Sequence, residues 1–379
     1  MLFSRELLLL YGLAGIGMIG GSLFRPILPI FTRAFGATGF EIGLLTSGFM
    51  IARAFVSIGS GKLIDLGYSS RKLIRIGFGL VVILTFFFLS VKSYLGILLI
   101  RVGQGICSGM IWPSAQIMVG GFSERGYRTR ALSIYQITGR IGMLLSRGIL
   151  IGILMIGTRL GYSAHERYRL VFLFAAILLM GGFLESWFLK GKEKEMEPKD
   201  AGGFHFDPIL PIAFIMGGLL SLQSIAILYF NEQFSIRPVD IVAILLIMDL
   251  VILVTTYLFS FIADRYGVKP ALLFIIIPCV VAGLGFPFQR IASLSLLFWF
   301  LTRVTVTGFI PIARSYATAQ KSGVGMSIGF LNMATNLGAV VGPALGGIIY
   351  DQLWGGFKIA SYSILSLLLP IFFFWLRRE

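Results

Sequence analysis

The sequence predicts an all-α integral membrane protein whose twelve transmembrane helices form two pseudo-symmetric six-helix bundles. Three observations predict this fold. First, 57% of the 379 residues are hydrophobic and only 13% are charged, whereas soluble domains carry about 25% charged residues. Second, twelve apolar stretches are each long enough to cross a bilayer, which takes about 20 residues in a helix. Third, one charged segment, residues 190–207, separates six of these stretches from the other six.

The twelve stretches are predicted helices rather than strands of a barrel, because they are long and lack a two-residue alternation of polarity. In chain order they cover residues 6–30, 41–63, 72–91, 94–118, 131–156, 168–189, 208–230, 238–262, 268–288, 292–313, 323–349 and 357–376. The segment 190–207 mixes both charge signs with Pro and Gly, which is typical of a solvated linker. We therefore predict an N-terminal bundle over residues 1–189, a cytoplasmic linker over 190–207 and a C-terminal bundle over 208–379.

The net charge of +15 concerns orientation in the membrane rather than nucleic acid. In an apolar chain, lysines and arginines decide which loops stay in the cytoplasm. With the N-terminus inside, 18 basic residues fall in cytoplasmic segments and 8 fall on the opposite side. The sequence therefore predicts a multi-pass protein of the plasma membrane with both termini in the cytoplasm, a lipid bilayer around it and no nucleic-acid partner.

A short motif after the second predicted span recurs after the eighth. Each copy has a small residue, an aspartate four positions later, and then basic residues. The first copy holds Gly61, Asp65 and Arg71, and the second holds Ser260, Asp264, Arg265 and Lys269, with 199 residues between the aspartates. Arg101 in the fourth span has a counterpart 202 residues later in Arg303 of the tenth. The two halves are therefore parallel repeats, an architecture known from transporters.

In these repeated motifs and in its twelve predicted spans, the chain resembles the major facilitator superfamily over its whole length. The fourth span matches the family pattern Arg-x-x-Gln-Gly-x-x-x-Gly at Arg101, Gln104, Gly105 and Gly109. The eleventh span matches a helix-packing pattern, Gly-x-x-x-Gly-Pro-x-x-Gly-Gly, at Gly338, Gly342, Pro343, Gly346 and Gly347. One departure concerns the fifth span, where Ser146-Arg147 replaces the Gly-Pro found in many exporters of the family. This departure puts the drug/proton antiporter subclass in doubt.

The repeated loop motif predicts a cytoplasmic gate. Asp65 and Asp264 lie at the cytoplasmic ends of spans, where the N-terminus of a neighbouring helix offers partial positive charge. Arg71 or Arg265 can pair with them, so we expect a contact that holds one conformation and breaks in another. An ordinary solvated charge worth under about 1 kcal/mol is the alternative. The predicted gate residues are Gly61, Asp65, Arg71, Asp264, Arg265 and Lys269.

Once the basic residues at the span ends are assigned to the two sides of the membrane, six arginines and no lysine remain inside the predicted spans: Arg25, Arg53, Arg101, Arg140, Arg147 and Arg303. A charge at mid-bilayer costs at least about 2.5–3.5 kcal/mol, so it marks a functional site by default. Two of them have open alternatives, because Arg25 can snorkel to the outer interface and Arg101 can serve either structure or coupling. A guanidinium recognises carboxylate or phosphate through two parallel hydrogen bonds. The arginines therefore predict a solute that is anionic or partly anionic.

Asp249 is the single carboxylate predicted at mid-membrane. It is either a proton-coupling group or the fixed ion-pair partner of Arg303. Other polar residues recur at helical spacing inside apolar spans, which favours a path lined by water. The predicted substrate and coupling site of the central cavity comprises Arg53, Arg101, Gln136, Arg140, Arg147, Asp249, Arg303, Asn332 and Asn336.

Together these patterns predict a secondary active transporter that moves a small organic solute by alternating access, with a proton as the coupling ion and no cofactor or metal. We expect a monomer and favour export, and import of an organic anion is the alternative. An intramembrane enzyme is disfavoured because the spans hold one Asp and no His. Gly61-Lys62 does not belong to a phosphate-binding loop, because Leu63 follows it where such a loop has Ser or Thr. ATP-driven transport is therefore disfavoured as well. A signalling role would leave the repeat and the polar stripes unexplained.

Overall fold

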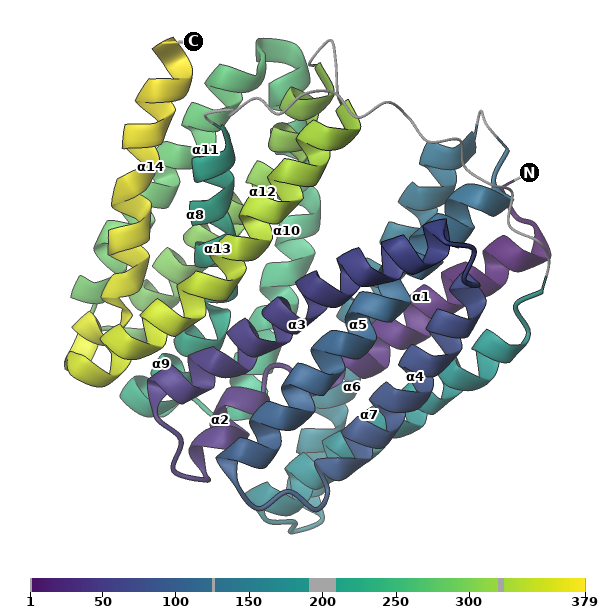
Figure 1. Ribbon diagram of the computed structural model, residues 1–379. Helices are drawn as coiled ribbons and strands as arrows, with labels where there is room; N and C mark the ends of the chain where they lie inside the picture. Colours follow the sequence, from purple (N-terminus) through teal and green to yellow (C-terminus); the bar gives the residue numbers. More distant parts are fainter. Residues whose placement is uncertain (1, 125–126, 191–208, 320–323, 379) are drawn as a thin grey trace. The chain divides into compact units, whose positions relative to one another are not determined.

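The computed structural model describes residues 2–124, 127–190, 209–319 and 324–378, and within these ranges the chain is helical without a β-strand (Figure 1). The first half forms α1 (Arg5–Leu23), α2 (Leu28–Arg33), α3 (Gly39–Asp65), α4 (Ser70–Phe87), α5 (Tyr94–Phe122), α6 (Arg128–Arg159) and α7 (Ala164–Trp187). The second half forms α8 (Ile209–Ser221), α9 (Gln223–Phe234), α10 (Pro238–Tyr266), α11 (Val268–Gly285), α12 (Ala292–Ala319), α13 (Val324–Gln352) and α14 (Ala360–Arg378), with short 3₁₀ turns η2 (Phe286–Phe288) and η3 (Gly355–Ile359).

Eleven helical segments of the described chain are long and apolar enough to span a membrane. The prediction of an all-α membrane protein is thereby confirmed. The remaining predicted span, 72–91, corresponds to α4, which has 18 residues. Its first six residues include Arg71, Lys72 and Arg75, and these charges make it more polar than the other spans. We interpret α4 as the twelfth spanning helix with a basic end.

The first helix of each half is interrupted, which the sequence analysis did not predict. The span expected over 6–30 is divided into α1 and α2 by a turn at Phe24–Ile27, where Arg25 and Pro26 lie. Proline lacks the N–H of a helical hydrogen bond and disfavours helical geometry in the residue before it. In the second half, α8 ends at Ser221 and α9 begins at Gln223.

The chain divides into two compact units, and each is described by itself. Unit 1 comprises residues 1–35, 48–198 and 238–246, and unit 2 comprises 36–47, 199–237 and 247–379. The beginnings of α3 and α10 thus belong to the opposite unit from the rest of their helices. The linker predicted over 190–207 lies outside the described residues apart from Lys190, so that boundary stays a prediction.

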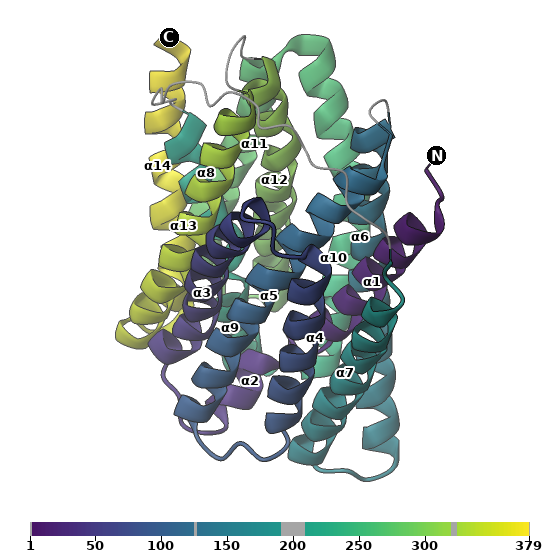
Figure 2. The ribbon, with the colours of Figure 1, turned by 45° about the vertical axis from the view of Figure 1, so that its right-hand side comes forward.

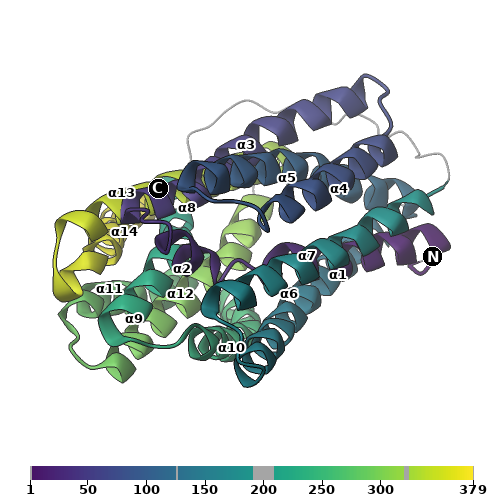
Figure 3. The same cartoon turned by 90° about the horizontal axis from the view of Figure 1, so that it is seen from below.

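Unit 1 is built on α1, which packs against α6 and α7, while α4 packs against α5 and α7 (Figure 3). The buried side chains at this junction include Leu10, Phe78, Ile111 and Met118. Glycines let the backbones meet, as where Gly142 of α6 lies against the carbonyl of Gly15 in α1. Small residues at helix contacts are what membrane bundles use, since lipid leaves little hydrophobic drive between helices.

Unit 2 is built on the contact of α13 with α8, which run side by side in Figures 1 and 2. The glycine motif of the eleventh span lies at this contact. Gly338 lies against the carbonyl of Phe214, Gly342 against Gly218, and Gly346 against Leu222. The other two motif residues face the segment 36–47 of the same unit, with Gly347 against the carbonyl of Gly39 and the Pro343 carbonyl against Gly43.

The two loop motifs share a backbone feature. Gly67, after α3, has φ 86°, and Gly267, after α10, has φ 89°. A positive φ is accessible to glycine at little cost and strained for other residues. The repeated glycine therefore allows the chain to turn sharply between two helices in both halves.

Candidate functional site

Four arginines from four separate elements act on one another in unit 1, and we call them the arginine cluster. Arg25 lies in the turn between α1 and α2, Arg53 in α3, Arg101 in α5 and Arg147 in α6. The charges of Arg53 and Arg147 both act on Arg25, and the charge of Arg25 acts on Arg101. The interruption of the first helix therefore places Arg25 at the centre of the cluster.

Arg101 is held in place by dipoles and aromatic rings. Its side chain is buried, and Nη1 donates to Oε1 of Gln104 at 2.8 Å. Gln104 in turn donates through Nε2 to Oγ1 of Thr85 at 3.1 Å. The guanidinium carbon lies 4.4 Å from the centre of the Phe49 ring and 6.0 Å from that of Phe24, so cation–π attraction adds to the hydrogen bonds. These contacts fix the guanidinium and leave its charge uncancelled.

Carboxylates are absent from the interior of the described unit 1 helices. The described acidic residues of unit 1 lie at the ends of these helices, either within the first or last three positions or just after the helix. They are Glu6, Asp65, Glu124, Glu166, Glu185 and Asp240. Within the cluster, Arg147 is buried, Arg53 is half-buried and Arg25 is exposed. Two like charges about 8 Å apart repel by roughly 2 kcal/mol at an effective dielectric constant of about 20. The cluster therefore concentrates positive charge among the described helices of unit 1.

Two predicted residues of α6 lie apart from this cluster. Gln136 and Arg140 are exposed, and among the described contacts neither touches the other arginines. The helix continues without a kink-forming proline through Ser146, whose hydroxyl donates to the carbonyl of Met143 at 2.6 Å. The predicted site residues of this helix therefore differ in burial: Gln136 and Arg140 are exposed, whereas Arg147 is buried.

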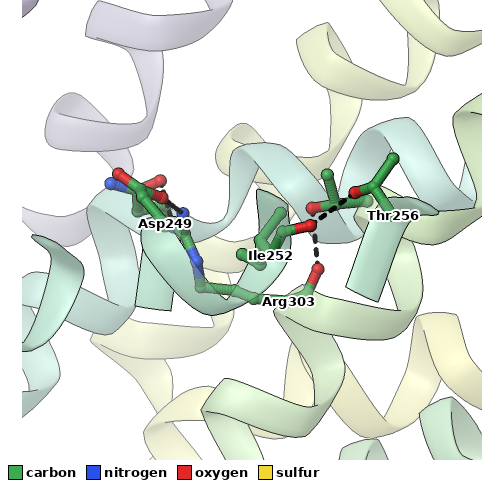
Figure 4. A network of polar contacts seen from close by, with 6 residues as sticks. Asp249, Ile252, Thr256 and Arg303 are labelled. Carbon is green, nitrogen blue, oxygen red and sulfur yellow. Dashed lines mark hydrogen bonds and ion pairs between the residues drawn. The ribbon is translucent and has the colours of Figure 1, made fainter. Parts of the chain in front are cut away.

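In unit 2 the arginine of the tenth span is neutralised. Arg303 of α12 donates through Nη2 to Oδ1 of Asp249 in α10 at 2.8 Å, and their side chains are 10% and 7% exposed (Figure 4). Arg303 also donates through Nη1 to Oε1 of Gln223, the first residue of α9. In this conformation Asp249 is therefore an ion-pair partner, which is one of its two predicted roles.

The repeat shows how the two units differ in charge. Arg101 and Arg303 are counterparts, yet Arg303 faces a carboxylate whereas Arg101 faces Phe49. Near the break in the first helix, unit 1 carries the charged Arg25 where unit 2 carries the neutral Gln223. The net positive charge predicted for the spans is thus concentrated in unit 1.

The remaining predicted residues have polar or exposed surroundings. Asn332 and Asn336 of α13 are exposed. The hydroxyl of Thr256 donates to the Ile252 carbonyl at 2.7 Å (Figure 4), and that of Ser260 to the Thr256 carbonyl at 2.9 Å. These hydroxyls are satisfied by their own helix, so they do not by themselves require water.

The gate residues stay a prediction. Asp264, Arg265 and Lys269 are exposed around the end of α10, where Arg265 lies 5.5 Å from the centre of the Tyr266 ring. Gly61 and Arg71 are half-buried. The side chain of Asp65 lies outside the described part of the chain.

Sequence reasoning missed Gln223 and the aromatic partners of Arg101. Gln223 is a polar residue inside an apolar span and lies 198 positions after Arg25, so the repeat offset was a usable signal. Phe49 carries no such signal, because phenylalanine is common throughout these spans and its contact depends on helix rotation.

The sequence matches the family profile described as "Major Facilitator Superfamily" over residues 10–211 and again over 209–379. Similar proteins include Multidrug resistance protein 2 of Bacillus subtilis (strain 168), which is 24% identical over 89% of this chain and 86% of its own length. Multidrug resistance protein 1 of the same organism is 25% identical over 89% of this chain and 87% of its own. Quinolone resistance protein NorA of Staphylococcus aureus (strain Mu50 / ATCC 700699) is 24% identical over 63% of this chain and 62% of its own.

Solved structures show the same fold. A bacterial homolog of the human lysosomal transporter Spinster, in an inward-facing and unoccupied conformation, has a TM-score of 0.78 at 16% identity, over 99% of this chain and 98% of that chain. The nucleoside transporter NupG has a TM-score of 0.77 at 14% identity, over 99% of both chains. At these identities the likeness concerns the fold alone.

Proposed function

The chain belongs to the Major Facilitator Superfamily and is a multi-pass membrane transporter rather than an enzyme; from this premise, we propose that it exports a small organic solute that carries negative charge. Alternating access of the two bundles would move the solute, and a proton gradient would drive it. We place the protein in the plasma membrane as a monomer with both termini in the cytoplasm, which the excess of basic residues in the cytoplasmic segments supports.

The arginine cluster is the observation that carries this proposal. Arg25, Arg53 and Arg101 meet in one unit whose described helices hold no carboxylate in their interior. Charges are retained inside a membrane protein where they serve a pathway or a site. Guanidinium groups from several helices suit a carboxylate or a phosphate, which accepts paired hydrogen bonds. The solute's anionic group would therefore bind against unit 1.

Export is supported by the relatives. Three of the similar proteins are named for resistance to drugs or quinolones, and a transporter that confers resistance does so by moving a compound outward. Their identities of 24% and 25% do not extend to a particular solute. The Ser146-Arg147 departure in the fifth span, where many exporters of the family have Gly-Pro, favours import of an organic anion instead.

The ion pair in unit 2 supports proton coupling. Asp249 and Arg303 are buried together at 2.8 Å, and Gln223 contacts the same guanidinium. A proton that binds Asp249 cancels the pair and frees Arg303, so proton binding and helix rearrangement are linked at one contact. In the structure Asp249 and Arg303 form an ion pair, which corresponds to ionised Asp249. Coupling would require a second state of the transport cycle in which Asp249 is protonated.

Import of an organic anion is the second candidate. The same arginine cluster favours it, because cells take up carboxylates and phosphate esters as nutrients. The two candidates share the binding chemistry and differ in direction.

Transport in membrane vesicles of known orientation tests the proposal. An anion that stabilises the purified protein against heat would serve as the solute. Everted vesicles made acidic inside are expected to accumulate this anion, and an uncoupler is expected to abolish the accumulation. Accumulation only in right-side-out vesicles that are acidic outside would favour import instead. Transport unaffected by either gradient would exclude the proton as coupling ion.

A further inference from the structure

Glu185 is a carboxylate in a setting that the proposed mechanism does not use. It lies in the last turn of α7, against α1 (Figure 3). Its Oε1 lies so close to Gly12 that a Cβ at position 12 would overlap this oxygen. Its Oε2 is buried and has no hydrogen-bond partner in the described part of the chain. The carboxyl group therefore faces an apolar helix contact with one oxygen unsatisfied.

The helices packed against α7 are α1, α4 and α6, and none of their charged groups neutralises Glu185. On α4, Arg75 is directed elsewhere, since its guanidinium donates to the carbonyls of Ser186, Trp187 and Leu189 at 3.2, 3.3 and 3.3 Å. On α1, Arg5 is exposed at the first helical position. The Tyr11 hydroxyl of the same helix donates to the Leu2 carbonyl at 3.2 Å, and Glu6 has the same sign as Glu185.

On α6, Tyr135 is buried and carries no positive charge, whereas Arg140 is exposed and Arg147 belongs to the arginine cluster. Among the described residues, no charged side chain acts on the Glu185 carboxyl. Glu185 thus differs from Asp249, which has Arg303 at 2.8 Å.

The position in the helix also disfavours a negative charge. The last turn of a helix carries partial negative charge from its unpaired carbonyl groups. An ionised carboxylate in an apolar contact without a cation is costly, and such a group takes up a proton instead. Arg75 binds carbonyls at this end of α7, so its hydrogen bonds are made to the helix end and not to the Glu185 carboxyl.

We propose that Glu185 is a proton-binding site of unit 1 and that its neutral form holds α7 against α1. Loss of the proton would place a charge against Gly12 and loosen this contact. A role in driving transport would rest on the proposed proton coupling, whereas proton binding itself does not.

Labelling with dicyclohexylcarbodiimide tests the proposal on the purified full-length protein. The reagent adds to a protonated carboxyl in an apolar setting, and the adduct rearranges to a stable N-acylurea without any oxidant. Glu166, which is exposed at the start of the same helix and whose Oε2 accepts a hydrogen bond from the Ser163 N–H at 2.7 Å, is the internal control. At about pH 7, where an ordinary glutamate is almost fully ionised, Glu185 is expected to be labelled about tenfold more than Glu166. Equal labelling of the two would overturn the proposal.

A second readout follows the helix contact. The thermal midpoint of the wild type is expected to fall as the pH rises from about 4.3, the ordinary pKa of glutamate, towards neutral, because over this range the folded state holds a proton that the unfolded chain has released. Glu185→Gln, which keeps the shape of the neutral carboxyl, is expected to flatten this fall and to lose the adduct, whereas Asp249→Asn keeps the adduct. An unchanged pH profile in Glu185→Gln would refute the link to the α1–α7 contact. Neither readout needs a solute or a gradient, so failure here is separable from failure of the proposed function.

Discussion

Replacing Arg303 with glutamine is expected to lower the free energy of unfolding by about 3–5 kcal/mol, because it leaves a buried carboxylate without its cation. Asp249 is 8% exposed and has Arg303 Nη2 at 2.8 Å from Oδ1. Gln223 cannot take over, since its amide supplies a dipole where the guanidinium supplied a charge. The loss would be measured as the shift of the denaturation midpoint in detergent or in a reconstituted bilayer.

A double variant separates the ion pair from simple loss of packing. Asp249→Asn with Arg303→Gln removes both charges and keeps two amides of similar shape, so most of the lost stability is expected to return. Each single variant alone leaves one charge buried. If the double variant were as unstable as the sum of the two singles, the pair would not be the source of the stability.

The second large effect concerns the contact of α13 with α8. Gly342→Ala is expected to cost about 1–3 kcal/mol, the usual penalty for overpacking, and Gly342→Leu is expected to prevent folding. A Cβ at position 342 would lie 2.5 Å from the Gly218 carbonyl oxygen, which is backbone and cannot rotate away. The two helices would have to separate along their length. Thermal denaturation and size-exclusion chromatography of the purified variants measure both outcomes.

Gly148 on α6 supplies the matched control. A Cβ there meets nothing within 4 Å, so Gly148→Ala is expected to be neutral or to stabilise by up to about 1 kcal/mol, since alanine favours a helix. Equal losses in Gly342→Ala and Gly148→Ala would mean that close backbone approach is not what position 342 requires.

The sequence was sufficient for the spans and for the family, because both depend on composition and spacing along the chain. It was insufficient for the interruption at Phe24–Ile27. Pro26 indicates a break, but membrane helices also tolerate proline when neighbouring groups satisfy the freed carbonyls. The predicted span 72–91 was counted for its apolar stretch and corresponds to α4, whose basic end reduces its apolar character.

The sequence indicated which residues belong to the candidate site, but not which side chains contact one another. An arginine inside a span is visible in any sequence, and all four members of the cluster were named from it. Whether Arg101 meets a carboxylate or an aromatic ring depends on how α5 and α3 are rotated, and that is a property of the packed bundle. Glu185 illustrates the same limit, since the sequence shows only that it lies near the end of the predicted span 168–189. Its contact with Gly12 appears only in the fold.

We infer that the arginine cluster of unit 1 binds the anionic group of the solute. The most direct test is the affinity of the purified protein for the organic anion that stabilises it best. Arg25→Gln and Arg53→Gln are each expected to weaken binding at least about tenfold, or about 1.4 kcal/mol. Arg159→Gln, an exposed arginine at the end of α6, is expected to leave the affinity unchanged. Equal affinity in the wild type and in both cluster variants would contradict the account.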